Sequence, residues 1–132
     1  MSGTILAIDP GKYQSGLAVL LDDKAVLERR VVKTIELPES VSEMCYKYQV
    51  PIIIIGSGGP GKSIEKKIAA SNVRSSIMFV NEKGSTMEAR KLYWQENSAR
   101  GLMRFLPAGL RVPPEPYDDY AAVIIGRRYL DK

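Results

Sequence analysis

Residues 5–20 decide the fold, and they read Ile5-Leu6-Ala7-Ile8-Asp9-Pro10-Gly11-Lys12-Tyr13-Gln14-Ser15-Gly16-Leu17-Ala18-Val19-Leu20. The four apolar residues before Asp9 are typical of a strand that is buried on both faces. Pro10-Gly11 predicts a turn and Gly16 opens a second apolar strand, so we expect a hairpin that leaves Asp9 at its mouth. Because Asp before Pro-Gly is ordinary turn chemistry, Asp9 taken alone does not indicate a site.

The same patterns predict the order of the remaining elements. We expect further strands over residues 16–21, 25–33, 51–56 and 76–80, and helices over residues 38–49, 63–71, 85–97 and 118–130. Ser85 and Glu88, three residues apart, predict a capping box at the start of the third helix. The proline-rich and glycine-rich residues 101–116 predict an irregular arm on the surface.

This order favours an α/β fold whose sheet mixes an antiparallel meander with parallel crossover strands. The chain has 132 residues, enough for one domain with a proper core and too few for two comfortable ones. We therefore expect a single domain over residues 1–132, with five strands in one sheet.

Composition excludes several kinds of chemistry. The chain has no histidine and one cysteine, Cys45, which rules out an internal disulfide, a Ser-His-Asp triad and an ordinary zinc site. Apolar residues make up 45% and charged residues 26%, as in ordinary soluble proteins, and neither a membrane-spanning run nor a leader pattern occurs. We expect a cytoplasmic protein without membrane partners. The net charge of +4 fits a polyanionic partner and gives that idea weak support.

Acidic residues come together at one predicted edge of the sheet. Asp9 ends the first strand and Glu82 follows the fifth, so both should lie at the carboxyl edge, where sites of α/β sheets tend to form. If the last helix packs across that edge, its amino end brings Asp118 and Asp119 near both. Carboxylates without histidine suit Mg²⁺ or Mn²⁺, and such ions support hydrolysis of phosphodiesters.

Each of these acids also has a purely structural explanation. Asp118 is placed as a helix N-cap, Asp119 as a first-turn acid that the helix dipole favours, and Glu82 as a turn residue. Only their joint placement at strand ends favours a metal site.

Three segments, taken in order, are similar to one known family. Ile5 to Ala18 resembles its opening strand, with an Asp and a downstream glycine. Asn81-Glu82-Lys83-Gly84-Ser85-Thr86 with Ala89 resembles its Asp-Glu-Arg-x-Ser-Thr-x-x-Ala signature, and Tyr117 to Ile125 resembles its terminal Asp helix. This family is the RuvC/YqgF-like branch of the ribonuclease H-like superfamily, which includes YqgF-type Holliday junction resolvases and pre-16S rRNA processing nucleases.

The resemblance implies a ribonuclease H-like fold, with helices on both faces of the mixed five-stranded sheet, and a Mg²⁺- or Mn²⁺-dependent nuclease. It implies that Asp9, Glu82 and Asp118 are the catalytic, metal-binding set and that Asp119 is an additional ligand. Nucleic acid would be the partner, either branched DNA or structured RNA. Symmetric cutting of a junction would require a homodimer, which no feature of the sequence demonstrates.

The chain departs from the family pattern in three places. Asn81 stands where the signature usually has Asp, and Lys83-Gly84 replaces Arg and an apolar residue. An inactive relative that only binds nucleic acid therefore stays open as an alternative. The arm over residues 92–114 is similar to a cyanobacterial-type subgroup. Its aromatic residues Trp94 and Phe105 could stack on bases, but we expect them in the core, and we expect Arg100 and Arg104 as contacts for phosphate.

A rival motif lies in Gly56-Ser57-Gly58-Gly59-Pro60-Gly61-Lys62-Ser63, which matches the phosphate-loop pattern between a strand and a helix. A nucleotide-binding protein is therefore a second alternative. Against it, the loop follows the fourth strand, and only about seventy residues remain after it for a nucleotide-binding core. In the nuclease interpretation, Lys62 and the backbone amides of this loop contact a nucleic-acid phosphate.

Overall fold

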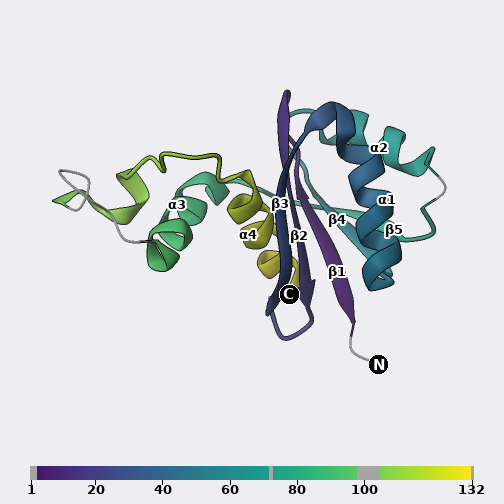
Figure 1. The fold of residues 1–132 in the computed structure, drawn as a ribbon, viewed down its shortest axis with the longest axis horizontal. Helices are drawn as coiled ribbons and strands as arrows, with labels where there is room; N and C mark the ends of the chain where they lie inside the picture. The colour runs from purple at the N-terminus through teal and green to yellow at the C-terminus, as the bar shows by residue number, and fades with distance from the viewer. Residues whose placement is uncertain (1–2, 72, 98–104, 132) are drawn as a thin grey trace.

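The computed structural model describes residues 3–71, 73–97 and 105–131, and these form one mixed sheet with the strand order β3-β2-β1-β4-β5 (Figure 1). The strands are β1 (Thr4–Asp9), β2 (Gln14–Leu21), β3 (Val26–Lys33), β4 (Ile52–Gly56) and β5 (Ser76–Val80). β1, β2 and β3 are an antiparallel meander, whereas β4 runs parallel to β1 and β5 parallel to β4. The predicted hairpin and the predicted parallel strands are both confirmed.

Helices cover both faces of this sheet, as predicted. Among the described residues, the α-helices are α1 (Leu37–Tyr48), α2 (Gly61–Ala69), α3 (Ser85–Glu96) and α4 (Asp118–Leu130), and the 3₁₀ turns include η1 (Thr34–Glu36) and η3 (Ala108–Leu110). Figure 1 shows α1 and α2 on one side of the sheet and α4 on the other. α3 packs beside α4 and, with residues 105–117, extends away from the sheet.

The two-residue period of the strands divides the core between the two helical layers. Leu6, Ile8 and Leu17 belong to the cluster that packs with α1 and α2. Ile5, Ala7 and Ala18 belong to the cluster that packs with α4. Both clusters are almost completely buried, which explains why the central strands are apolar on successive residues.

The region around α3 differs from two expectations. Gly84, with φ of 77°, precedes α3 and no side-chain cap forms, so the capping box of Ser85 and Glu88 is wrong. Glu88 instead accepts a hydrogen bond from Arg128. Phe105 is 72% exposed, so its predicted core position is wrong as well.

The other predicted core aromatic, Trp94, is half-buried beside Tyr93, and its Nε1 donates to the Arg111 carbonyl at 2.8 Å. Across the described ranges, no helix is long and apolar enough to cross a membrane.

Candidate metal-binding site

Asp9 lies at the carboxyl end of the central strand. It is the last residue of β1 and pairs across the sheet with Gly16 of β2. Its side chain is half-buried. The strand end therefore points a carboxylate at the place where the helical layer meets the edge of the sheet.

Asp118 reaches the same place because Gly16 has no side chain. A Cβ atom at Gly16 would collide with the backbone of Asp118 and Asp119, at the start of α4. The glycine therefore lets the amino end of the helix lie directly on β2, opposite Asp9. Asp118 is close enough that its negative charge raises the pKa of Asp9.

Glu82 enters from the loop after β5. A Cβ atom at Gly56 or at Gly58 would meet the Glu82 carboxylate well inside contact distance. The glycine-rich loop thus makes room for this side chain, which forms a hydrogen bond with Asp9.

The electrostatics of these acids are unfavourable without a cation. Burial, then the charges of Glu82 and Asp118, and finally the hydrogen bond with Glu82 raise the pKa of Asp9 from 3.8 to about 7. Burial and the neighbouring charge of Asp119 also raise the pKa of Asp118. A divalent cation would remove this repulsion, and oxygen donors alone are the set that Mg²⁺ or Mn²⁺ prefers.

The oxygen donors suit such an ion in their chemistry, but their side chains are not yet arranged as metal ligands. Across residues 3–71, 73–97 and 105–131, no three or more acids or cysteines already stand in the geometry of metal ligands. Asp9, Glu82 and Asp118 are the residues that would hold the ion.

Asp119, the fourth acid of the prediction, has a different partner. Its Oδ2 accepts a hydrogen bond from Arg29 of β3 at 2.8 Å, and the guanidinium of Arg29 lies 4.1 Å from the ring centroid of Tyr120. Only 9% of Asp119 is exposed, so this ion pair neutralises a buried charge. The structure therefore ties Asp119 to β3 and leaves Asp118 beside Asp9.

The sequence patterns did not predict the role of Arg29 as the partner of Asp119. Its signal was present, because Glu28-Arg29-Arg30 interrupts the apolar pattern of a strand that ends up covered by α1 and α4. A charged residue in a covered strand needs a partner, and here that partner, Asp119, is 90 residues away in the chain, outside any local pattern.

The remaining predicted residues fall around the site or outside the described chain. Lys62 is exposed in the first turn of α2, next to the glycine-rich loop. Arg100 and Arg104 lie outside the described residues. Asn81, which stands where the signature has Asp, accepts the Lys83 amide at 2.8 Å with its Oδ1. An aspartate would make the same turn bond, so this departure leaves the position of Glu82 unchanged.

The glycine-rich loop does not have the surroundings of a nucleotide site. A phosphate loop presents its backbone amides to phosphate oxygens, whereas here the Glu82 carboxylate faces Gly56 and Gly58. A second negative group would be repelled from that position. The glycines are therefore explained by their contact with Glu82.

Comparison with known proteins agrees with the architecture. No protein-family model and no curated protein matches the sequence. Among solved structures, Thermus thermophilus RuvC in complex with a Holliday junction substrate matches at 17% identity with a TM-score of 0.56, covering 93% of this chain and 89% of that one. A second RuvC structure from Thermus thermophilus matches at 14% identity with a TM-score of 0.56, covering 92% and 89%.

The chain has the ribonuclease H-like fold of RuvC. The predicted fold class is therefore confirmed. At this level of identity the RuvC-like comparison concerns the fold, and the activity has to be argued from the site itself.

Proposed function

We propose that this protein is a divalent-metal-dependent endonuclease that hydrolyses phosphodiester bonds in branched DNA. The observation that carries the proposal is the meeting of Asp9, Glu82 and Asp118 at the carboxyl edge of a ribonuclease H-like sheet. Three crowded carboxylates are costly to the fold, and a bound Mg²⁺ or Mn²⁺ would offset their repulsion. A purely structural role gives no reason for the crowding.

The three acids have distinct tasks in this proposal. Asp9, on the rigid central strand, fixes the position of the ion, and Asp118 approaches from α4 with its backbone held on Gly16. Glu82, beside the glycine-rich loop, would be the third carboxylate to hold the ion. The bound ion would activate the attacking water and stabilise the charge that develops on the phosphate. Lys62, Arg100 and Arg104 are proposed contacts for the substrate backbone.

The choice of branched DNA is supported by the RuvC-like fold, since the Thermus thermophilus RuvC structure holds a Holliday junction substrate. Structured precursor RNA is the competing substrate, and a relative that binds without cutting is the competing class. Cutting a junction symmetrically would need two copies of the chain, so the number of chains per bound junction belongs to the same assay.

The test is a cleavage assay with an end-labelled four-way junction, its linear duplex and a precursor rRNA fragment. Wild-type protein is expected to cut the junction with Mg²⁺ or Mn²⁺ and not with a chelator. Asp9→Asn should lower the rate by at least about 1,000-fold, because a charged metal ligand is lost while its shape is kept.

Glu28→Gln is the matched control, since Glu28 is an acid bound to β3 and α1 and is expected to leave the rate unchanged. Cutting of the RNA alone would move the substrate from DNA to RNA. No cutting with either ion, or equal rates for wild type and Asp9→Asn, would contradict the nuclease proposal.

A further inference from the structure

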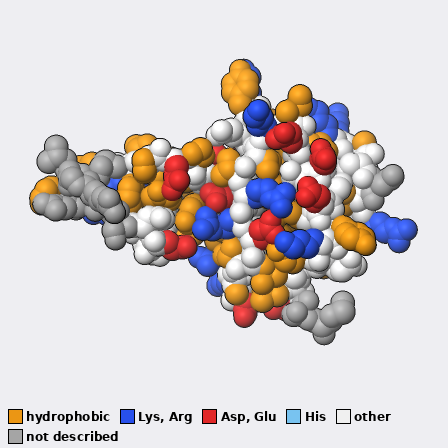
Figure 2. All heavy atoms as spheres, in the orientation of Figure 1, with side chains coloured by type: hydrophobic (Ala, Val, Ile, Leu, Met, Phe, Trp, Pro, Cys, Tyr) orange, Lys and Arg blue, Asp and Glu red, His pale blue; other side chains and the backbone are white. Residues whose placement is uncertain are grey.

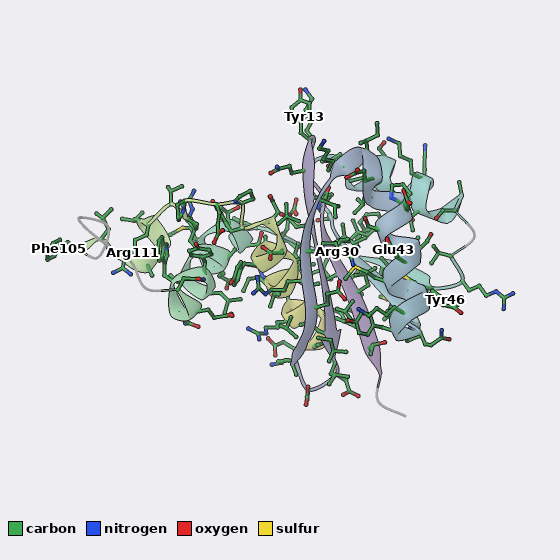
Figure 3. All side chains as sticks on the ribbon, in the orientation of Figure 1. Tyr13, Arg30, Glu43, Tyr46, Phe105 and Arg111 are labelled. Atoms are coloured by element: carbon green, nitrogen blue, oxygen red, sulfur yellow. The ribbon has the colours of Figure 1, made fainter. Side chains whose placement is uncertain are left out.

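A second feature of the same edge has no part in holding a metal. The turn between β1 and β2 carries Tyr13, which is 75% exposed and projects from the end of the hairpin (Figure 3). Ile35 of η1 is 87% exposed beside it. Lys12, Tyr13, Gln14, Lys33 and Ile35 line a shallow hollow of about 390 Å³. We call these five residues the hairpin-tip surface.

The turn that presents Tyr13 is held rigidly. The Gly11 amide donates to the Ser15 hydroxyl at 3.2 Å, and the Thr34 hydroxyl donates to the Gly11 carbonyl at 2.8 Å. Ser15 and Thr34 hydroxyls are 2.8 Å apart, and the Thr34 amide donates to the Tyr13 carbonyl at 2.8 Å. Ser15 is fully buried. The backbone that carries the exposed ring is therefore fixed by a closed network of hydrogen bonds, so the ring starts from a defined position.

The tightness of the turn also depends on Gly11. A Cβ atom there would collide with the Gln14 carbonyl oxygen, so the backbone folds more closely than another residue allows. A turn with no role beyond joining two strands has no need to carry a large exposed aromatic side chain on so closely held a backbone. The construction indicates that Tyr13 meets a partner at a defined position.

The charge of the surface indicates which kind of partner. Lys12 Nζ lies 5.3 Å from the Tyr13 ring centroid, and Lys33 lines the same hollow from the end of β3. Within the described part of the chain neither lysine forms an ion pair, and the residues that line the hollow include no acid. An aromatic face flanked by two available cations matches a nucleobase and its neighbouring phosphates.

We propose that Tyr13 stacks on an unpaired nucleobase of the substrate while Lys12 and Lys33 bind the adjacent phosphates. This inference rests on the proposed function for its substrate class. Tyr13 follows Asp9 by one tight turn. A nucleobase stacked on Tyr13 would therefore belong to the part of the nucleic acid that enters the metal site. The hairpin-tip surface would select nucleic acid with an unstacked base, such as the centre of a junction or a bulge, over continuous duplex.

The experiment measures binding without cleavage. Oligonucleotides carrying 2-aminopurine at an unpaired bulge or at a junction centre are titrated with Asp9→Asn protein in a chelator, and base fluorescence and anisotropy are recorded. Adding Tyr13→Ala should weaken binding about 10-fold and abolish the change in base fluorescence. Adding Tyr13→Phe should preserve both, because the ring stacks without its hydroxyl group.

Tyr46→Ala is the matched control, because Tyr46 is 82% exposed on α1, on another part of the surface (Figure 3), and should bind as the parent does. Lys12→Ala and Lys33→Ala should weaken binding to all sequences and reduce the slope of log affinity against log salt by about 1 each. Continuous duplex should show little dependence on Tyr13.

The outcomes separate this inference from the nuclease proposal. Normal binding and fluorescence with Tyr13→Ala, or an equal loss with Tyr46→Ala, would overturn the stacking role even if the wild type cuts junctions. A loss specific to Tyr13, in a protein that never cuts, would support the stacking role and contradict the nuclease. Failure to bind any of the nucleic acids would overturn both.

Discussion

The acids at the carboxyl edge of the sheet and the acid Glu28 on β3 have opposite surroundings. At the carboxyl edge, Asp9, Glu82 and Asp118 lie close together, and the pKa of Asp9 rises to about 7. On β3, Glu28 accepts hydrogen bonds from Tyr48 and Arg30, each at 2.7 Å, and from Lys47 at 3.1 Å.

These partners, with Tyr48 first, lower the pKa of Glu28 to about 2. Figure 2 shows positive and negative side chains next to one another in the middle of this face. Arg30 and Glu43, which form an ion pair there, are labelled in Figure 3. The comparison teaches that the fold satisfies acids whose role is structural. It leaves Asp9, Glu82 and Asp118 crowded together, as expected of acids at a functional site.

The same contrast occurs between two neighbours in the sequence. Asp118 faces the crowded edge, and Asp119 is held by Arg29. Successive residues of a helix point about 100° apart, so α4 assigns one acid to each environment.

The largest effect on stability is expected from breaking the ion pair between Arg29 and Asp119. Arg29→Met keeps the bulk of the side chain and leaves the Asp119 carboxylate buried without its partner. We expect the free energy of unfolding to fall by about 3 kcal/mol in urea denaturation. The double variant Arg29→Met with Asp119→Asn should recover most of the loss. A change below about 1 kcal/mol for the single variant would mean that the pair contributes little.

A somewhat smaller effect on stability is expected from adding a divalent cation to the crowded carboxylates Asp9, Glu82 and Asp118. At 100 times its dissociation constant, Mn²⁺ should stabilise the wild type by about 2.7 kcal/mol, since it binds only the folded chain. Thermal unfolding with and without the ion measures this as a rise in Tm. Asp9→Asn and Asp118→Asn should lose the rise, whereas Glu28→Gln should keep it. An equal rise in all four proteins would place the ion elsewhere.

The third difference between the two regions is in the pH dependence of stability, measured in a chelator. Asp9 has a raised pKa, so its contribution to stability is full below 3.8 and is lost as pH rises toward about 7. Glu28 has a lowered pKa, so its contribution is full above 4.5 and is lost as pH falls toward about 2.

The free energy of unfolding, measured by chemical denaturation between pH 2 and pH 8, should fall less toward high pH in Asp9→Asn than in the wild type. In Glu28→Gln it should fall less toward low pH. Identical profiles for the two variants would remove the contrast between the two regions.

Much of this arrangement was predictable, because it follows from local patterns. The apolar run before Asp9 and the turn at Pro10-Gly11 predicted the hairpin, and the strand ends predicted that Asp9 and Glu82 share an edge. The capping box failed because the Ser-x-x-Glu pattern says nothing of Arg128, which binds Glu88. The glycine-rich loop resembled a phosphate loop because its contact with Glu82 is not visible in the loop itself.

The sequence by itself determined the element order, the parallel edge and the presence of acids at strand ends, because side-chain periodicity and turn chemistry act over a few residues. Only the tertiary structure decided that Asp118, and not Asp119, joins Asp9, and that two glycines admit Glu82. Those choices depend on how closely α4 lies on Gly16 and on which charge Arg29 neutralises. Contacts between residues so far apart in the chain leave no periodic signal that could be recognised in advance.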